Sequence, residues 1–137
     1  MIDLPNKLSD LVDAALDDLE AVERDPAYLV DMEVFYKPGK NGVCHVCLAG
    51  AVMVRRLGIR PDKEMLLKNF GNSDTRGKLY ALDYFAYGYI SDALSSMGLY
   101  NLEEPDCPDW QDYDHTDPKI FKTQARAAAA TLRAKGL

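Results

Sequence analysis

Residues 42–58 read GVCHVCLAGAVMVRRLG, and they contain the longest apolar run of the chain, Val46 to Val54. The residues LAGAVMV within this run have no polar face, which predicts a helix that is buried in the protein interior. Inside an exposed helix, a glycine costs about 1 kcal/mol relative to alanine. The presence of Gly50 therefore predicts either that another helix approaches closely at this point or that Gly50 belongs to a site.

The ten residues before the turn-forming sequence PGKNG alternate in the manner of a β-strand. In YLVDMEVFYK, residues 28–37, apolar side chains occupy every second position in the middle of the segment. Pro-Gly and Asn-Gly are both typical of turns. Residues 43–46 are then expected either to return as a second strand, which would make a hairpin, or to begin the buried helix at once.

The N-terminal part of the chain predicts an amphipathic helix. Seven apolar residues recur at helical spacing and form one stripe: Leu8, Leu11, Val12, Ala15, Leu16, Leu19 and Val22. Three aspartates fall on the opposite face: Asp10, Asp13 and Asp17. We expect the side chain of Asp3 or Asn6 to cap the start of this helix.

Further helical segments follow the buried helix. Residues 61–72 are expected to form a short helical turn and a loop, and apolar residues then keep helical spacing as far as Met97. Gly88 is expected to kink this segment or to split it in two. A last helix is expected to begin near Pro118 and to turn four of its side chains inward: Ile120, Phe121, Ala128 and Leu132.

The length and composition indicate one globular domain, residues 1–137, with 47% hydrophobic and 28% charged residues. The longest apolar run is far shorter than the roughly 20 residues of a membrane-spanning helix, and the N-terminus lacks a signal-peptide pattern. We therefore expect a cytoplasmic protein without membrane association. The predicted fold class is α+β and mostly helical, with four to five helices around a buried central helix and one short β-hairpin.

The net charge is −6, and the acids gather in two segments. Residues 1–35 carry ten acids and two bases, and residues 101–118 carry seven acids and no base. An acidic chain is not expected to bind nucleic acid directly. The aspartates at positions 10, 13 and 17 are instead candidates for a surface that binds a basic partner, although such a face is more often simply solvated.

Residues 80–89 are rich in tyrosine, with Tyr80, Tyr84, Tyr87 and Tyr89 around Phe85. Aromatic residues at this spacing usually belong to the core or to its edge. Tyrosines that lie beyond the apolar stripe are candidates for a binding patch, because their rings combine apolar area with a polar hydroxyl. We take Tyr84 and Tyr87 as the candidate partner-binding residues of this segment.

The Cys44-x-x-Cys47 pair admits three interpretations. It is the spacing of half a zinc site, and Cys107 with His115 is the possible second half. Alternatively, one cysteine at a helix start is a nucleophile, with His115 as its base and Asp112 or Asp114 beside it. The third interpretation is two small buried side chains, which we favour because free cysteine is among the most buried residue types. We accordingly expect no cofactor, and zinc is the alternative.

Four stretches carry a resemblance across nearly the whole chain: DLEAVERDPAYLVDMEVFYKP, VCHVCLAGAVM, KLYALDYFAYGYISDAL and FKTQARAAAATLRAKGL. They resemble a group of small uncharacterised proteins of bacterial tailed phages and prophages, most specifically in the C-x-V-C-L-A-G-A stretch of residues 44–51. The resemblance implies a phage accessory protein that acts in the host bacterial cytoplasm. Proteins in that setting often bind a host protein or protein complex, including defence systems.

The resemblance provides no catalytic residue. The function that we expect is therefore a non-enzymatic accessory protein that binds a host macromolecule through its acidic and tyrosine-bearing surfaces. The alternative is a zinc-binding or thiol-dependent protein that uses Cys44 and Cys47.

Overall fold

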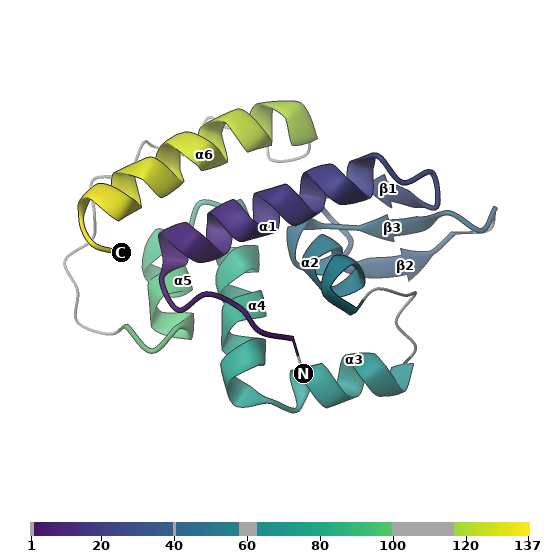
Figure 1. Cartoon of the computed structure of the whole chain (residues 1–137), viewed down its shortest axis with the longest axis horizontal. Coiled ribbons are helices and arrows are strands. Elements are labelled where there is room, and N and C mark those ends of the chain that lie inside the picture. Colours follow the sequence, from purple (N-terminus) through teal and green to yellow (C-terminus); the bar gives the residue numbers. More distant parts are fainter. Residues whose placement is uncertain (1, 40, 58–62, 100–116) are drawn as a thin grey trace.

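The computed structural model describes residues 2–39, 41–57, 63–99 and 117–137, and these form six helices and one three-stranded sheet (Figure 1). The helices are α1 (Leu8–Glu23), α2 (Leu48–Leu57), α3 (Lys63–Phe70), α4 (Ser73–Ala86), α5 (Ile90–Ser96) and α6 (Pro118–Ala134). The strands are β1 (Tyr28–Val30), β2 (Tyr36–Pro38) and β3 (Cys44–Val46). The mostly helical α+β class is confirmed, with one helix more than the four or five expected.

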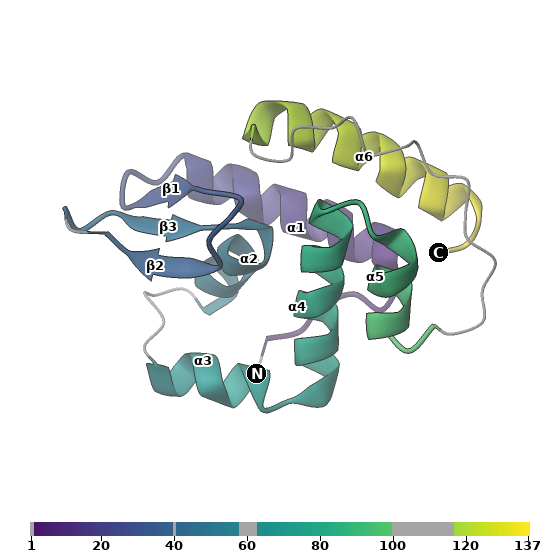
Figure 2. The ribbon, with the colours of Figure 1, turned by 180° about the vertical axis from the view of Figure 1, so that it is seen from behind.

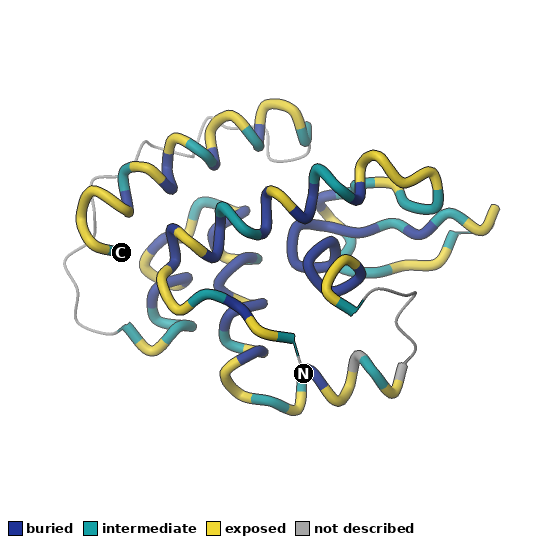
Figure 3. Tube along the Cα trace, in the orientation of Figure 1, coloured by how far each residue is buried: buried dark blue, intermediate teal, exposed yellow. Residues whose placement is uncertain are grey.

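Helix α2 lies at the centre of this arrangement, between α1, the sheet and α4. Every residue from Leu48 to Val54 is buried, so the buried central helix that the apolar run predicts is confirmed (Figure 3). Helix α6 packs along α1, and α5 packs against α4. None of the described helices is long and apolar enough to cross a membrane.

Helix α1 buries the whole predicted apolar stripe, from Leu8 to Val22. Its N-cap is Lys7, which makes no side-chain capping hydrogen bond, so the prediction of Asp3 or Asn6 as the cap was wrong. The Asn6 side chain has another partner, because its Oδ1 accepts a hydrogen bond of 2.8 Å from the Lys78 ammonium of α4. A contact between distant segments has replaced the local cap.

The sheet has the order β1-β3-β2. Strands β2 and β3 are antiparallel, with Tyr36 opposite Val46, and they form the predicted hairpin. The single strand predicted over residues 28–37 is wrong, because the chain turns after β1 and β1 pairs with β3 in parallel. Asp31 stabilises this turn: its Oδ1 accepts a hydrogen bond of 3.1 Å from the backbone N–H of Glu33.

Gly50 packs against the polypeptide backbone between β1 and β2, and not against a helix as expected. A Cβ added at Gly50 would lie 1.7 Å from the carbonyl oxygen of Phe35. Only a residue without a side chain allows this approach. Gly50 therefore fixes the position of the connection between β1 and β2, on the side of the sheet that faces α4 (Figure 2).

The C-terminal helices begin and end close to the expected positions. Gly88, with a φ of 85°, separates α4 from α5, so the prediction of a split helix is confirmed. The Asp117 side chain caps α6 by accepting a hydrogen bond of 3.0 Å from the backbone N–H of Lys119. Helix α6 buries Phe121 and the alanines that face α1, but Ile120, which was expected inside, is 44% exposed.

Candidate interaction surface

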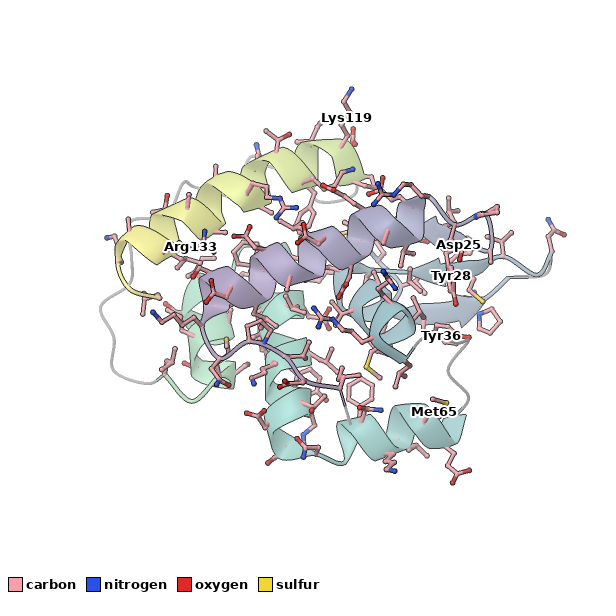
Figure 4. All side chains as sticks on the ribbon, in the orientation of Figure 1. Asp25, Tyr28, Tyr36, Met65, Lys119 and Arg133 are labelled. Atoms are coloured by element: carbon pink, nitrogen blue, oxygen red, sulfur yellow. The ribbon has the colours of Figure 1, made fainter. Side chains whose placement is uncertain are left out.

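The acidic face of α1 meets two arginines of α6. Asp13 accepts hydrogen bonds from Arg126 Nη1 at 3.0 Å and from Arg133 Nη2 at 2.6 Å. Asp17 lies 2.8 Å from Arg126 Nη2, and Asp10 lies 3.1 Å from Arg133 Nη2. Figure 4 shows Arg133 towards one end of α6 and Lys119, which points into solvent, at the other end.

These ion pairs change the expected role of the three aspartates. Burial alone would raise the pKa of the Asp13 carboxyl, but hydrogen bonds from Arg133 and Arg126 outweigh burial and lower this pKa. Part of the acidic charge is therefore neutralised within the chain. Asp10 and Asp17 keep side-chain exposures of 53% and 71%, so they still present charge to the solvent.

Helix α4 presents a stripe of tyrosines. Tyr80, Tyr84 and Tyr87 follow one another at intervals of four and three residues, which places them on one face of the helix. Tyr89 lies beside them, because its backbone N–H donates a hydrogen bond of 2.8 Å to the carbonyl of Tyr84. We call these four residues the tyrosine face.

The tyrosine face is partly exposed, whereas the opposite side of α4 is in the core. The four side chains are 41–58% exposed, and Leu79, Leu82 and Phe85 of the same helix are buried. Seven large hydrophobic residues are exposed in the part of the chain that the structure describes, and four of them are these tyrosines. The predicted tyrosine-bearing surface is therefore present, and it includes both Tyr84 and Tyr87.

Acidic groups lie within and beside the tyrosine face. Asp83 follows Tyr80 by three residues and precedes Tyr87 by four, so its carboxylate rises from the same side of α4. Burial raises the pKa of the Tyr87 hydroxyl, and the charges of Asp83, Cys47 and Glu33 add to the rise. The charge of Glu33, on the connection between β1 and β2, thus acts on the Tyr87 hydroxyl.

The Cys47 thiol lies beneath this face, 3.9 Å from Asp83 Oδ1. Burial raises the pKa of the Cys47 thiol to about 11, and the charge of Asp83 contributes to the rise. Burial also raises the pKa of the Asp83 carboxyl, while the hydrogen bond from Cys47 opposes the rise. Without a bound metal ion, Cys47 is thus a protonated thiol at neutral pH, whereas a cysteine nucleophile is a thiolate.

The two cysteines of the C-x-x-C pair have different partners. Cys44 is fully buried on β3, with its Sγ 3.9 Å from the Tyr36 hydroxyl, while Cys47 contacts Asp83. Within the described ranges, no three residues among histidine, cysteine, aspartate and glutamate are grouped so that they could hold a metal ion. Cys107 and His115 lie outside the described residues, so the four-residue zinc site stays a prediction.

His45 belongs to a small polar site that the sequence did not indicate. Its side chain is on the opposite face of the sheet from Cys44, and its Nδ1 lies 3.4 Å from Asp31 Oδ2. A hollow of about 360 Å³ beside this pair is also lined by Lys37 and Gly39. Among the residues that the structure describes, those that line the hollow include no serine, threonine or cysteine.

No protein-family model matches this chain, and neither the curated proteins nor the solved structures include a significant match.

Proposed function

We propose that this chain is a non-enzymatic binding protein and that its contact surface is the tyrosine face of α4. The observation that carries this proposal is the grouping of four half-exposed tyrosines on one helix and the turn that follows it. Tyrosine is enriched among the residues that dominate binding energy at protein interfaces. Its rigid ring supplies apolar contact area at a low cost in conformational entropy, and its hydroxyl supplies a hydrogen bond.

The proposed partner is a host protein or protein complex. The resemblance to proteins of tailed phages and prophages supports this choice, and with it a role as a phage-encoded accessory protein in the host bacterial cytoplasm. Inhibition of a host defence system is the consequence of binding that we propose to test first.

The acidic surface has a secondary part in this proposal. Asp13 is held by two arginines of α6, so its first role is in the fold. Asp10 and Asp17 retain exposure and can attract a basic partner over a distance of roughly 8–10 Å at physiological ionic strength. Such attraction acts mainly on the association rate.

The geometry favours binding over thiol chemistry. A reactive cysteine is a partly exposed thiolate in an electropositive environment. Cys47 is instead buried, adjacent to a carboxylate, and has a pKa raised to about 11.

The test is affinity capture from a host lysate, followed by a binding measurement with each captured protein. We expect the double substitution Tyr84→Ala/Tyr87→Ala to weaken binding about 30-fold or more, the loss typical of a pair of dominant interface residues. Unfolding in urea should show a stability within about 0.5 kcal/mol of wild type for the single substitution Tyr84→Ala, since the ring is at the surface.

The matched control is Leu67→Ala/Ile120→Ala, which removes two exposed apolar side chains from α3 and α6. We expect this variant to bind the captured protein as tightly as the wild type. A partner that binds the tyrosine variant and the wild type equally well would show that the contact surface lies elsewhere.

A further inference from the structure

We infer that the tyrosine face binds an arginine-bearing segment of a partner protein. This inference rests on the proposed function and specifies the chemistry of the partner. Three observations carry it: the aromatic stripe, the carboxylates within and beside it, and the lack of a basic residue in the same part of the chain.

The charge of this region is not neutralised within the described structure. Residues 79–99 contain two aspartates and no lysine or arginine. Asp83 has a thiol as its hydrogen-bonding neighbour, and Glu33 forms no ion pair with a basic residue of the described part of the chain. This differs from α1, where Asp13 and Asp17 meet arginines.

The basic residues earlier in α4 are engaged elsewhere. Arg76 donates a hydrogen bond of 3.1 Å to the carbonyl of Phe70, at the end of α3. Lys78 is buried, and its ammonium contacts the Leu4 carbonyl and Asn6 Oδ1 at 2.8 Å each, and Asp74 Oδ2 at 3.0 Å. An ammonium has three protons to donate, so all of them have acceptors.

A guanidinium fits this surface better than an ammonium does. It is planar, so it stacks on aromatic rings, and its forked N–H groups match a carboxylate. It is also more weakly hydrated, which favours contact with a partly apolar face. Asp83 is half-buried at the edge of this stripe, three residues after Tyr80 and four before Tyr87, so one guanidinium that stacks on either of these rings can donate to the Asp83 carboxylate.

The same features disfavour nucleic acid as the partner. Single-stranded nucleic acid stacks its bases on aromatic side chains, but it also needs basic residues along the path of its phosphates. Asp83 and Glu33 would repel those phosphates, and residues 79–99 offer no lysine or arginine.

The probe is a capped peptide with three arginines spaced by Gly-Ser, compared with the same peptide carrying three lysines. Both are titrated into the full chain at low salt and followed by NMR. We expect the arginine peptide to bind about three- to fivefold more tightly, because a guanidinium can stack flat on a ring while it donates to a carboxylate, and an ammonium cannot. The largest chemical-shift changes are expected at Asp83, Tyr84 and Tyr87.

Variants separate ring stacking from charge. Tyr84→Leu/Tyr87→Leu keeps apolar side chains but removes the rings, so it should abolish the preference for arginine, whereas Tyr84→Phe/Tyr87→Phe should retain it. Asp83→Asn should weaken both peptides several-fold. The matched control, Asp10→Asn, changes an exposed carboxylate on α1 and should leave the preference unchanged.

Four results would each overturn the inference. The two peptides could bind equally well, or the chemical-shift changes could centre on α1. Single-stranded DNA could bind in a way that requires the tyrosines, or the chain could associate with itself through them. A host partner that requires Tyr84 and Tyr87 while the peptides show no preference would overturn the arginine inference and leave the proposed function intact. The proposed function is wrong if the captured partner binds the variant without Tyr84 and Tyr87 as tightly as the wild type.

Discussion

Where α1 meets α6, the Asp13 carboxylate lies within 3.0 Å of two guanidinium groups, whereas the Asp83 carboxylate at the tyrosine face has a thiol at 3.9 Å as its neighbour. Both carboxylates belong to amphipathic helices of an acidic chain. The first stabilises a contact between helices, and the second is half-buried on the side of α4 that carries the exposed tyrosines. The comparison teaches that the number of acids in a segment does not determine how much acidic surface remains available to a partner.

The largest change in stability is expected at Gly50, which packs against the connection between β1 and β2. Gly50→Ala would place a Cβ 1.7 Å from the Phe35 carbonyl oxygen, so the connection that carries Glu33 must move. We expect a loss of about 3 kcal/mol or more in the free energy of unfolding, at the upper end for an overpacked core. Urea denaturation measures this loss.

The control for this substitution is Gly71→Ala, on an exposed residue at the end of α3. Its added Cβ would lie 3.2 Å from the Leu67 carbonyl oxygen, a tight contact that a shift of a few tenths of an ångström relieves. We expect a change below about 1 kcal/mol there. If Gly50→Ala is as stable as wild type, the close approach of Gly50 to Phe35 does not fix the position of the connection between β1 and β2.

The next effect tests the contact between α1 and α6. Arg126→Ala removes the partner of Asp13, Asp17 and Glu20. Exposed ion pairs contribute about 0.2–1 kcal/mol each, so we expect a loss of about 1–2 kcal/mol for this network, reduced in high salt. Lys119→Ala, on an outward-pointing residue of the same helix, is the control and should change stability by less than about 0.5 kcal/mol. Equal effects of the two substitutions would mean that the network contributes nothing.

The smallest change in stability is expected from the titration of Asp13 and Asp83, which should depend on pH in opposite directions. The lowered pKa of Asp13 stabilises the fold above the unfolded pKa of about 4, and this contribution disappears as pH falls through the folded value. The raised pKa of Asp83 has the opposite sign: stability is greatest below the unfolded value and falls as pH rises through the folded value.

Asp13→Asn should therefore cost up to about 1 kcal/mol at pH 7 and less at pH 3. Asp83→Asn should be more favourable relative to wild type at pH 7 than at pH 3. Urea denaturation of both variants at the two pH values measures these differences. The same sign of pH dependence for both variants would contradict the contrast between the two surfaces.

The features that could be predicted from the sequence are those set by local spacing. The apolar stripe of α1 and the unbroken apolar run of α2 report burial directly, because a helix repeats every 3.6 residues. The break between α4 and α5 could be predicted, because one glycine in the sequence, Gly88, is enough to end a helix. The tyrosine face was predictable for the same reason, because Tyr80, Tyr84 and Tyr87 follow the helical period.

The features that could not be predicted depend on contacts between distant residues. The alternation of residues 28–37 continues through the turn at Asp31 because Met32 is buried there, so it imitates one long strand. Gly50 indicates a close approach but not what approaches. No local pattern shows that Arg126 reaches Asp13 or that Cys47 reaches Asp83, and these contacts help to decide which acids are neutralised and which thiol has a raised pKa.

The contact between α1 and α6 also has a kinetic consequence. Asp13 and Arg126 are 113 residues apart in the chain, so their meeting requires the closure of a very large loop, whereas α4 and α5 are joined by a single turn. Large loops close at a high entropic cost, which delays such contacts during folding. We therefore expect α6 to dock late and to detach early, so that the arginines of α6 mainly slow unfolding and hardly affect the folding rate.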